Sequence, residues 1–134
     1  MALQRCPNLI VLPTRFDVYR REAAIIRGIL YQFTSIIEPL SLDEAYLDVT
    51  SHPSAPAALA QEIRAAIFRT TKLTSSAGIG PNKLIAKIAS DINKPNGQCE
   101  VKPEQVAEFM KSHLLPKRYL KVVDFISENK IRIM

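Results

Sequence analysis

Residues 15–33 carry apolar side chains at spacings of three and four, which is the pattern of a helix with one apolar face. This spacing predicts a helix over about residues 17–33. The apolar positions of the series are Phe16, Tyr19, Ala23, Ile26, Leu30 and Phe33. Residues 34–50 are instead rich in β-branched and aromatic residues, and Pro39 interrupts them. Because proline cannot donate to a sheet ladder, we expect two short strands around a turn or bulge.

Three more helices and one strand are predicted downstream. A helix over about residues 55–71 follows serine and proline start signals, and a strand of small residues over 74–80 allows close approach by other backbone. A third helix over 81–93 has Pro81 in its first turn and ends where Pro95 and Gly97 force a turn. A fourth helix begins at Pro103. The apolar faces are Leu59, Ile63 and Ile67 in the second helix, Leu84, Ile88 and Ile92 in the third, and Val106, Phe109, Met110 and Leu114 in the fourth.

The stretch 117–134 has no clean period, so no element is predicted there. The order helix, strand pair, helix, strand, helix predicts an α/β fold with helices packed on one face of a sheet. A chain of 134 residues has the length of a single domain. No apolar run approaches the roughly 20 residues that span a bilayer, and the first 13 residues do not have a signal-peptide pattern. We therefore expect a cytoplasmic protein without a membrane partner.

The positions of cysteine and histidine and the net charge exclude few classes of function. Cys6 and Cys99 are far apart in the sequence and have no nearby histidine, so neither a zinc site nor a disulfide framework is indicated. Lysine and arginine number 18 against 13 aspartate and glutamate, a formal net charge of +5. This charge favours an anionic partner such as nucleic acid or a nucleotide.

Asp43 and Glu44 place two carboxylates inside the strand-like stretch "SLDEAYLDVT". Burying an unpaired carboxylate costs several kcal/mol, so the two must be exposed, paired or bound to metal. Neighbours on a regular strand point to opposite faces, and a bend near Pro39 would let both reach one site. Two hard oxygen ligands without histidine or cysteine suit Mg²⁺ or Mn²⁺. The alternative from spacing alone is a solvated turn.

Lys83, Lys87 and Lys94 lie on the third predicted helix and its exit. Phosphate binding needs such cations, but "GIGPNK" lacks the spacing and the terminal residues of a Walker loop. From spacing alone, a solvated basic face is the more common structure. Asp48 and Asp91 are likewise expected to be a strand-edge charge and a helix-surface charge, although either could be a metal ligand.

Two long motifs together resemble the palm of Y-family DNA polymerases, most closely those of the bacterial DinB type. They are "SLDEAYLDVT" and "SSAGIGPNKLIAKIASDINKPNGQ", in the family's order and at a similar distance. The resemblance extends to "RCPNLIVLPTRFDVYR" upstream and to "VKPEQVAEFMKSHLLP", which is similar to the beginning of the thumb. It implies a partial polymerase palm with a mixed or antiparallel sheet in residues 1–100, followed by a short helical thumb segment in 101–134.

The family resemblance implies template-directed, error-prone nucleotidyl transfer past damaged DNA by a two-Mg²⁺ mechanism, with Mn²⁺ as a substitute. It places Asp43 as the carboxylate shared by both metals and Glu44 as a ligand of the catalytic metal. Lys94 matches a lysine that would hold the triphosphate of the incoming nucleotide. The implied partners are primer–template DNA and deoxynucleoside triphosphates, with a sliding clamp for the full-length protein.

The chain also departs from the family pattern. Family members begin with a strand that carries another metal-binding aspartate, followed by fingers that grip the triphosphate, and nothing in residues 1–15 substitutes for these. After Pro116 the family has a glycine-containing hairpin of helices, whereas residues 117–134 contain no glycine. We therefore expect a fragment that is inactive alone and that exposes apolar surface. The alternatives are a catalytically dead product with at most weak DNA or protein binding, and an unrelated α/β domain.

Overall fold

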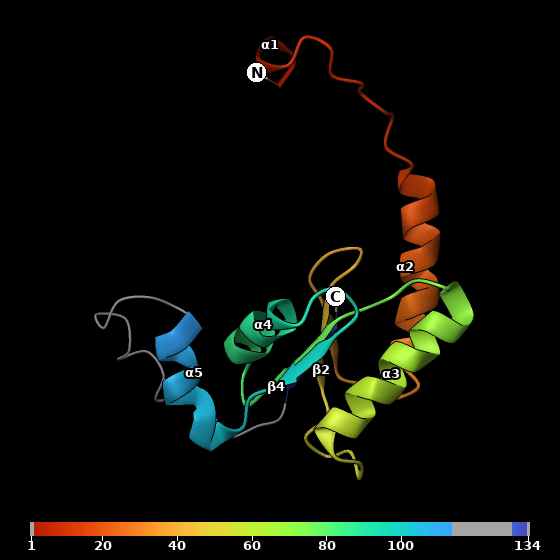
Figure 1. Cartoon of the computed structure of the whole chain (residues 1–134). Helices are drawn as coiled ribbons and strands as arrows, with labels where there is room; N and C mark the ends of the chain where they lie inside the picture. Colours follow the sequence, from red (N-terminus) through yellow and green to blue (C-terminus); the bar gives the residue numbers. More distant parts are fainter. Residues whose placement is uncertain (1, 114–129, 134) are drawn as a thin grey trace.

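A five-stranded mixed sheet with the strand order β1-β2-β5-β3-β4 forms the centre of the molecule (Figure 1). The computed structural model describes residues 2–113 and 130–133. β3 and β4 are parallel, and the other pairings are antiparallel. The elements are α1 (Ala2–Arg5), α2 (Phe16–Leu30), β1 (Ile37–Pro39), β2 (Ala45–Asp48), α3 (Pro56–Thr71), β3 (Ala77–Gly80), α4 (Lys83–Ile92), β4 (Gln98–Glu100), η1 (Pro103–Gln105), α5 (Val106–His113) and β5 (Lys130–Ile133).

The predicted mixed α/β class is confirmed, and most elements form where the sequence pattern placed them. The first long helix ends at Leu30, three residues earlier than expected, and the N–H of Tyr31 donates to the carbonyl of Arg27 at its end. β1 and β2 form the expected pair of short strands, with Pro39 opposite Ala45. Pro39 is tolerated because β1 is an edge strand.

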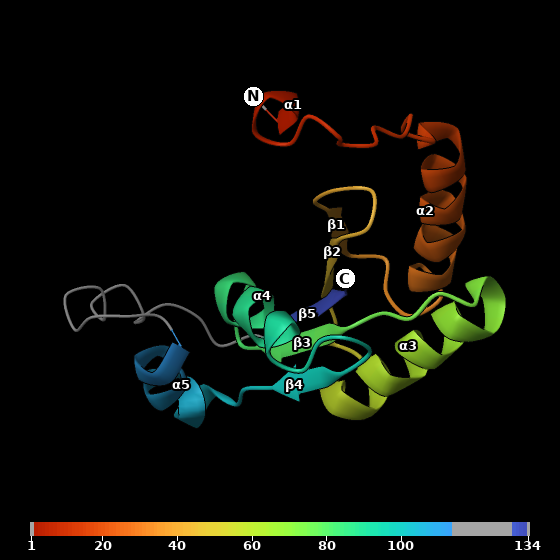
Figure 2. The same ribbon diagram turned by 45° about the horizontal axis from the view of Figure 1, so that its top comes forward.

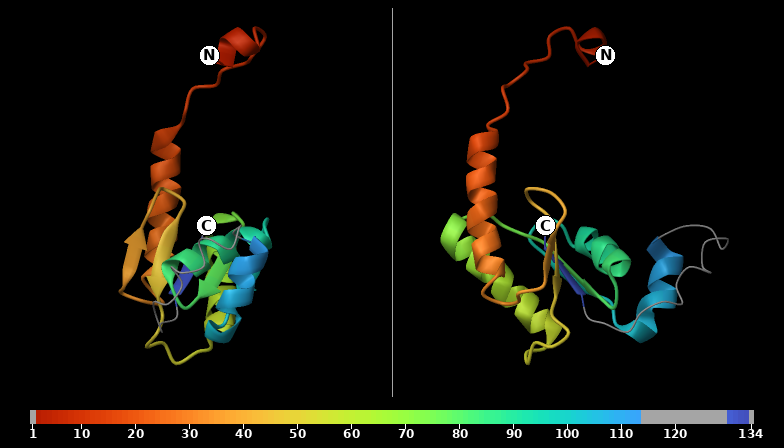
Figure 3. Two further views of the ribbon diagram at one scale, coloured as in Figure 1. Left: turned by 90° about the vertical axis from the view of Figure 1, so that its left-hand side faces the viewer. Right: turned by 180° about the vertical axis from the view of Figure 1, so that it is seen from behind.

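The sheet is covered on both faces, which corrects the expectation that all helices share one face. Ala77 and Ile79 of β3 pack in the same core cluster as Leu59 and Ile63 of α3. α4 instead lies against the alternate positions of β3, where a Cβ on Gly78 would come within 1.9 Å of the carbonyl oxygen of Ala86 in α4. Figure 3 (right) shows α3 and α4 on opposite sides of the strands. The small residues of this strand therefore permit close packing of a helix, as predicted.

The buried face of α4 differs from the predicted one. Leu84 and Ile92 are 49% and 40% exposed, and Ile88 is only partly buried. The helix buries another set, namely Ile85, Ala86, Ala89 and Ser90. The small residues Ala86 and Ser90 of this set lie against Gly78, where close packing leaves no room for larger side chains, and Ile85 lies beside Gly80. Pro81 precedes the helix, and the side chain of Asn82 caps it by accepting the N–H of Ile85 at 2.9 Å.

β5 occupies the middle of the sheet although the sequence predicted no element there. It pairs with β2 on one side and with β3 on the other. Ile131 and Ile133, with exposed fractions of 0% and 3%, join the main apolar core. This core also includes side chains from α2 and α3. Residues 117–134 carry no clean period in the sequence, so only the pairing partners of β5 define it.

A second, smaller core joins α4 to α5. Val106 and Met110 are buried there and Phe109 is partly buried, as predicted, whereas Leu114 lies outside the described residues. η1 precedes this helix and begins at Pro103, the predicted start.

The N-terminal arm carries much of the exposed apolar surface that the sequence led us to expect. In both views of Figure 3 it projects away from the sheet. Ile10 and Leu12 are 83% and 78% exposed. Figure 2 shows that α1 lies at the far end of this arm. In the part of the chain that the structure describes, every helix is too short or too polar to cross a bilayer.

We predict that Gly78→Ala lowers the free energy of unfolding by about 3 kcal/mol, at the upper end for overpacking, because the new Cβ would overlap backbone atoms of α4. Gly28→Ala is the matched control. It has no heavy atom within 4 Å of the new Cβ and lies in α2, so it should add about 0.5–1 kcal/mol of stability. Urea unfolding followed by circular dichroism measures both values. Equal stabilities of the two variants would contradict this packing of α4.

We also predict that Ile131→Ala lowers the free energy of unfolding by about 2–5 kcal/mol, since this side chain is fully buried in the core. Ile10→Ala, at a largely exposed position, should leave the stability unchanged. The same unfolding assay applies to both variants. A neutral result for Ile131→Ala would show that β5 does not occupy the centre of the sheet in solution.

Candidate active site at one end of the sheet

The loop between β1 and β2 presents Asp43 and Glu44. The carbonyl of Glu44 accepts the N–H of Leu40 at 2.9 Å and that of Ser41 at 3.4 Å, which closes the turn. The hydroxyl of Ser41 donates to Oδ1 of Asp43 at 2.8 Å. Both acidic residues therefore lie in the turn before β2 begins at Ala45, and the strict alternation of a strand does not apply to them.

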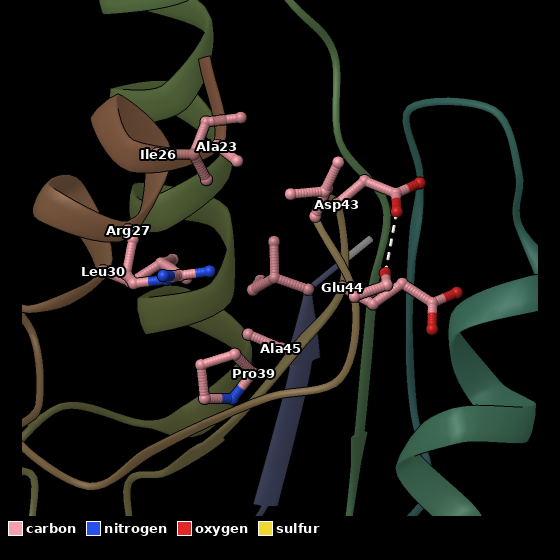
Figure 4. A pocket seen from close by; sticks show the side chains of 11 residues that line it. Ala23, Ile26, Arg27, Leu30, Pro39, Asp43, Glu44 and Ala45 are labelled. Carbon is pink, nitrogen blue, oxygen red and sulfur yellow. Dashed lines mark hydrogen bonds between the residues drawn. The ribbon is translucent and has the colours of Figure 1, made fainter. Parts of the chain in front are cut away.

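The two carboxylates point to the same side of the hairpin in Figure 4, away from the α2 residues that face its other side. The pocket between α2 and the hairpin is lined mainly by apolar residues, such as Ala23, Ile26 and Leu30, and Asp43 and Glu44 also belong to its lining. Asp43 is exposed and Glu44 is half-buried. The bend that the metal-site hypothesis requires is therefore present.

Lys94 lies at the same end of the sheet as the two carboxylates. In the strand register, Ala45, Ile133, Ala77 and Gln98 form one row across four strands. Asp43 and Glu44 precede the first member of this row, and the α4–β4 loop, residues 93–97, precedes the last (Figure 1). The turn that carries Lys94 and the acidic hairpin thus lie at the same end of the sheet, with β5 and β3 between their strands.

The ammonium group of Lys94 contacts Oδ1 of Asp91 at 2.7 Å. The two side chains are 40% and 58% exposed, and an exposed pair of this kind contributes only about 0–1 kcal/mol. A more highly charged anion could therefore displace Asp91 at low cost. Asp91 itself is the helix-surface charge that the sequence led us to expect.

The remaining charged candidates lie away from this end or have other partners. Lys83 pairs with Glu38 and lies 5.8 Å from the centre of the Tyr46 ring, so it ties α4 to the hairpin. Oδ1 of Asp48 accepts the N–H and the hydroxyl of Thr50. Asp48 ends β2, about 13 Å along the strand from Glu44, which excludes it from the same metal site.

Asp43 and Glu44 fit part of a magnesium or manganese site by the chemistry of their oxygen donors. Within residues 2–113 and 130–133, no group of three or more histidine, cysteine, aspartate or glutamate residues could hold a metal ion. The two carboxylates would thus need water, nucleotide oxygens or a further ligand to complete the coordination of an ion.

The sequence analysis did not single out Arg64, yet this residue of α3 organises the α4–β4 loop. Its guanidinium donates to groups of Ser75, Asn96 and Gln98, and burial lowers its pKa from the usual value. The one available signal is that Arg64 directly follows the buried Ile63 in α3. That signal gives no information about its partners, which lie 11 to 34 residues away in the sequence.

Comparison with known proteins identifies close relatives of the chain. The model of the impB/mucB/samB family matches residues 1–91. DNA polymerase IV of Francisella tularensis subsp. novicida (strain U112) is 52% identical across 100% of this chain, which covers 39% of that relative. DNA polymerase IV of Cronobacter sakazakii (strain ATCC BAA-894) is 54% identical over 87% of this chain and 34% of that relative. The chain therefore spans well under half the length of the curated relatives it matches.

Solved structures give the same result for the fold. The insertion ternary complex of Dbh DNA polymerase has a TM-score of 0.70 and 36% identity over 83% of this chain and 33% of that one. DinB from Sulfolobus solfataricus has a TM-score of 0.69 and 33% identity over 81% of this chain and 33% of that one. These neighbours confirm the resemblance drawn from the two motifs.

We predict that the chain binds Mn²⁺ only weakly, without saturating at a stoichiometric amount, because two carboxylates leave most coordination positions to water. The combined variant Asp43→Asn and Glu44→Gln should lose this binding. A control variant, Glu104→Gln, removes an exposed charge far from the hairpin in sequence and should retain it. The loss of the free Mn²⁺ signal in electron paramagnetic resonance measures the binding. Tight binding, or binding that survives the double variant, would contradict the site.

Proposed function

The chain belongs to the impB/mucB/samB family of Y-family DNA polymerases, and from this premise we propose that it forms part of the palm of an error-prone translesion DNA polymerase. The proposed reaction is template-directed nucleotidyl transfer, with primer–template DNA and deoxynucleoside triphosphates as substrates. The observation that carries the proposal is the placement of Asp43 and Glu44 on one side of a hairpin turn, at the sheet end that also bears the Lys94 turn.

Asp43 and Glu44 are proposed to hold Mg²⁺, with Mn²⁺ as a substitute. When bound, the metal would supply positive charge for a primer hydroxyl and for the triphosphate. The hydrogen bond from Ser41 orients the Asp43 carboxylate before any ligand arrives. The turn closed by Leu40 and Glu44 keeps both carboxylates at the exposed end of the hairpin, where a substrate can reach them.

Lys94 is proposed to bind the triphosphate of the incoming nucleotide as a point charge. Its weak surface pair with Asp91 holds the ammonium group near the end of α4, and a triphosphate carries more negative charge than one carboxylate. Exchange of Asp91 for the nucleotide therefore needs little energy. Lys87 is exposed on the same helix and receives no role in the proposal.

The isolated chain is proposed to be inactive. The middle of its sheet is occupied by β5, whose four residues, Lys130–Ile133, include two cations and no carboxylate. The central strand thus adds no third metal ligand beside the acidic hairpin. The competing hypothesis is a dead product that binds DNA or a protein weakly, and the basic net charge of +5 is its support.

The domain division also belongs to the proposal, with residues 1–100 as the partial palm and 101–134 as the start of the thumb. β4 ends at Glu100, at the proposed boundary, and η1 and α5 follow it. β5, from the second segment, returns to the palm sheet. A sliding-clamp partner of the full-length protein stays a prediction from the family.

We predict that the isolated chain does not extend a primer with Mg²⁺ and four deoxynucleotides. Activity should appear in a chimera in which residues 2–113 replace the aligned segment of the Francisella polymerase, because that relative supplies the rest of the protein. In the chimera, Asp43→Asn or Glu44→Gln should reduce extension by about 100-fold or more, the size of effect seen when a group that stabilises transition-state charge is removed. Gel-based primer extension measures all variants.

Asp17→Asn is the matched control, since Asp17 is an exposed carboxylate in the first turn of α2. It should leave the activity of the chimera unchanged. Full activity of the Asp43→Asn chimera would refute the assigned metal ligands. Extension by the isolated chain would refute the proposed need for a third carboxylate, and an inactive but folded chimera would favour the dead product.

A further inference from the structure

We propose that Arg64 is a positioning residue that holds the α4–β4 loop so that Lys94 stays at the sheet end bearing Asp43 and Glu44. The inference rests on the proposed triphosphate role of Lys94 and adds a residue of a different element, α3, to that site. Arg64 acts through the loop and does not touch the nucleotide.

The guanidinium of Arg64 joins three chain segments at one point. Nε donates to the carbonyl of Ser75 at 2.8 Å, and Nη1 donates to Oε1 of Gln98 at 3.1 Å. Nη2 donates to the side-chain oxygen of Asn96 at 2.9 Å and also to its main-chain carbonyl. Ser75 precedes β3, Gln98 begins β4, and Asn96 lies two residues after Lys94. The network therefore fixes the loop relative to both strands.

These contacts leave Arg64 little capacity to bind a ligand itself. A guanidinium has five N–H groups, and the four hydrogen bonds to Ser75, Gln98 and Asn96 use most of them. Arg64 is half-buried, and this partial burial lowers the pKa of its guanidinium. Its planar fork matches several acceptors at once, which the single ammonium of a lysine cannot do.

The loop depends on such support because its backbone is unusual. Asn96 has a φ of 52°, in the left-handed region that asparagine tolerates better than most residues. A Cβ on Gly97 would lie 1.9 Å from the carbonyl oxygen of Asn93, so the turn accepts only glycine there. The side chain of Asn93 donates to the carbonyl of Gln98 at 2.8 Å. Arg64 lies outside the loop and donates a hydrogen bond to the main-chain carbonyl of Asn96.

Loss of the Arg64 guanidinium would affect the α4–β4 loop and leave the acidic hairpin in place. Without the guanidinium, the acceptors on Asn96 and Ser75 lose a charge-assisted partner, and such bonds are stronger than neutral ones. The turn would then sample other conformations, and the Lys94 ammonium would spend less time where a triphosphate can meet it. The acidic hairpin, which lies on other strands, would keep its geometry.

The test measures binding of inorganic tripolyphosphate to the full 134-residue chain by calorimetry, at about 0.15 M salt so that distant charges are screened. Arg64→Met, which keeps the apolar stem, should weaken binding roughly tenfold, as is typical when a group that orients a ligand is removed. Arg64→Lys should recover only part of this loss. Arg69→Met, on an exposed position of the same helix, removes the same charge and should have little effect.

A double-mutant cycle separates positioning from direct contact. If Arg64 acts through Lys94, then adding Arg64→Met to Lys94→Met should cause no further loss of affinity. Additive losses would mean that Arg64 meets the anion itself and would overturn the inference. An unchanged affinity in Arg64→Met would also overturn it, provided thermal unfolding shows that the variant is folded.

Amide hydrogen exchange of residues 93–98 gives a readout that needs no ligand. Arg64→Met should speed exchange in this loop and leave residues 40–45 unchanged. If the wild-type chain shows no binding that depends on Lys94, the proposed function of Lys94 fails, and the exchange data still decide whether Arg64 holds the loop. Unchanged exchange would reject that role, and faster exchange throughout the chain would show a general loss of stability instead of positioning.

Discussion

Backbone pairing between β5 and its two neighbours joins the two halves of this molecule. The β1–β2 hairpin and the β3–β4 pair meet only through that strand in the described sheet. Its register aligns Ala45 with Ala77 through Ile133, and this alignment sets which loops share an end of the sheet. The acidic turn and the Lys94 turn belong to different halves, so their shared position at one end of the sheet depends on the pairing of this short strand, with the contact of Lys83 and Glu38 as a second link.

The same strand also bears on the third metal ligand that the proposed reaction would need. The Ile133 end of this central strand lies beside Ala45, which directly follows the acidic turn. Lys130 and Arg132 are the polar residues that β5 contributes, and neither can bind a metal cation. The family relationship supports a polymerase palm, and the residue types of β5 are the basis for proposing that the chain is inactive alone.

Local patterns made the helices and the β1–β2 hairpin predictable, because spacing, start signals and Pro39 all act within a few residues. Long-range contacts were not predictable. The buried face of α4 depends on its contacts with Gly78 and Gly80 of another element, which the spacing of its apolar residues does not reveal. That Asp43 and Glu44 share a side depends on a turn whose shape a strand pattern does not predict. The partners of Arg64 and the pairing of β5 are defined only by the folded structure.

The sequence distance between β2 and β5, roughly 80 residues, has a consequence for the order of folding. Closing so long a loop costs more chain entropy than forming the local hairpin or packing α4 on β3, so we expect the central strand to join after these local elements. Until it does, β2 and β3 each present an open edge of unpaired N–H and C=O groups to other chains. The time during which these edges can pair with other chains therefore depends on how soon the four residues of β5 pair with β2 and β3.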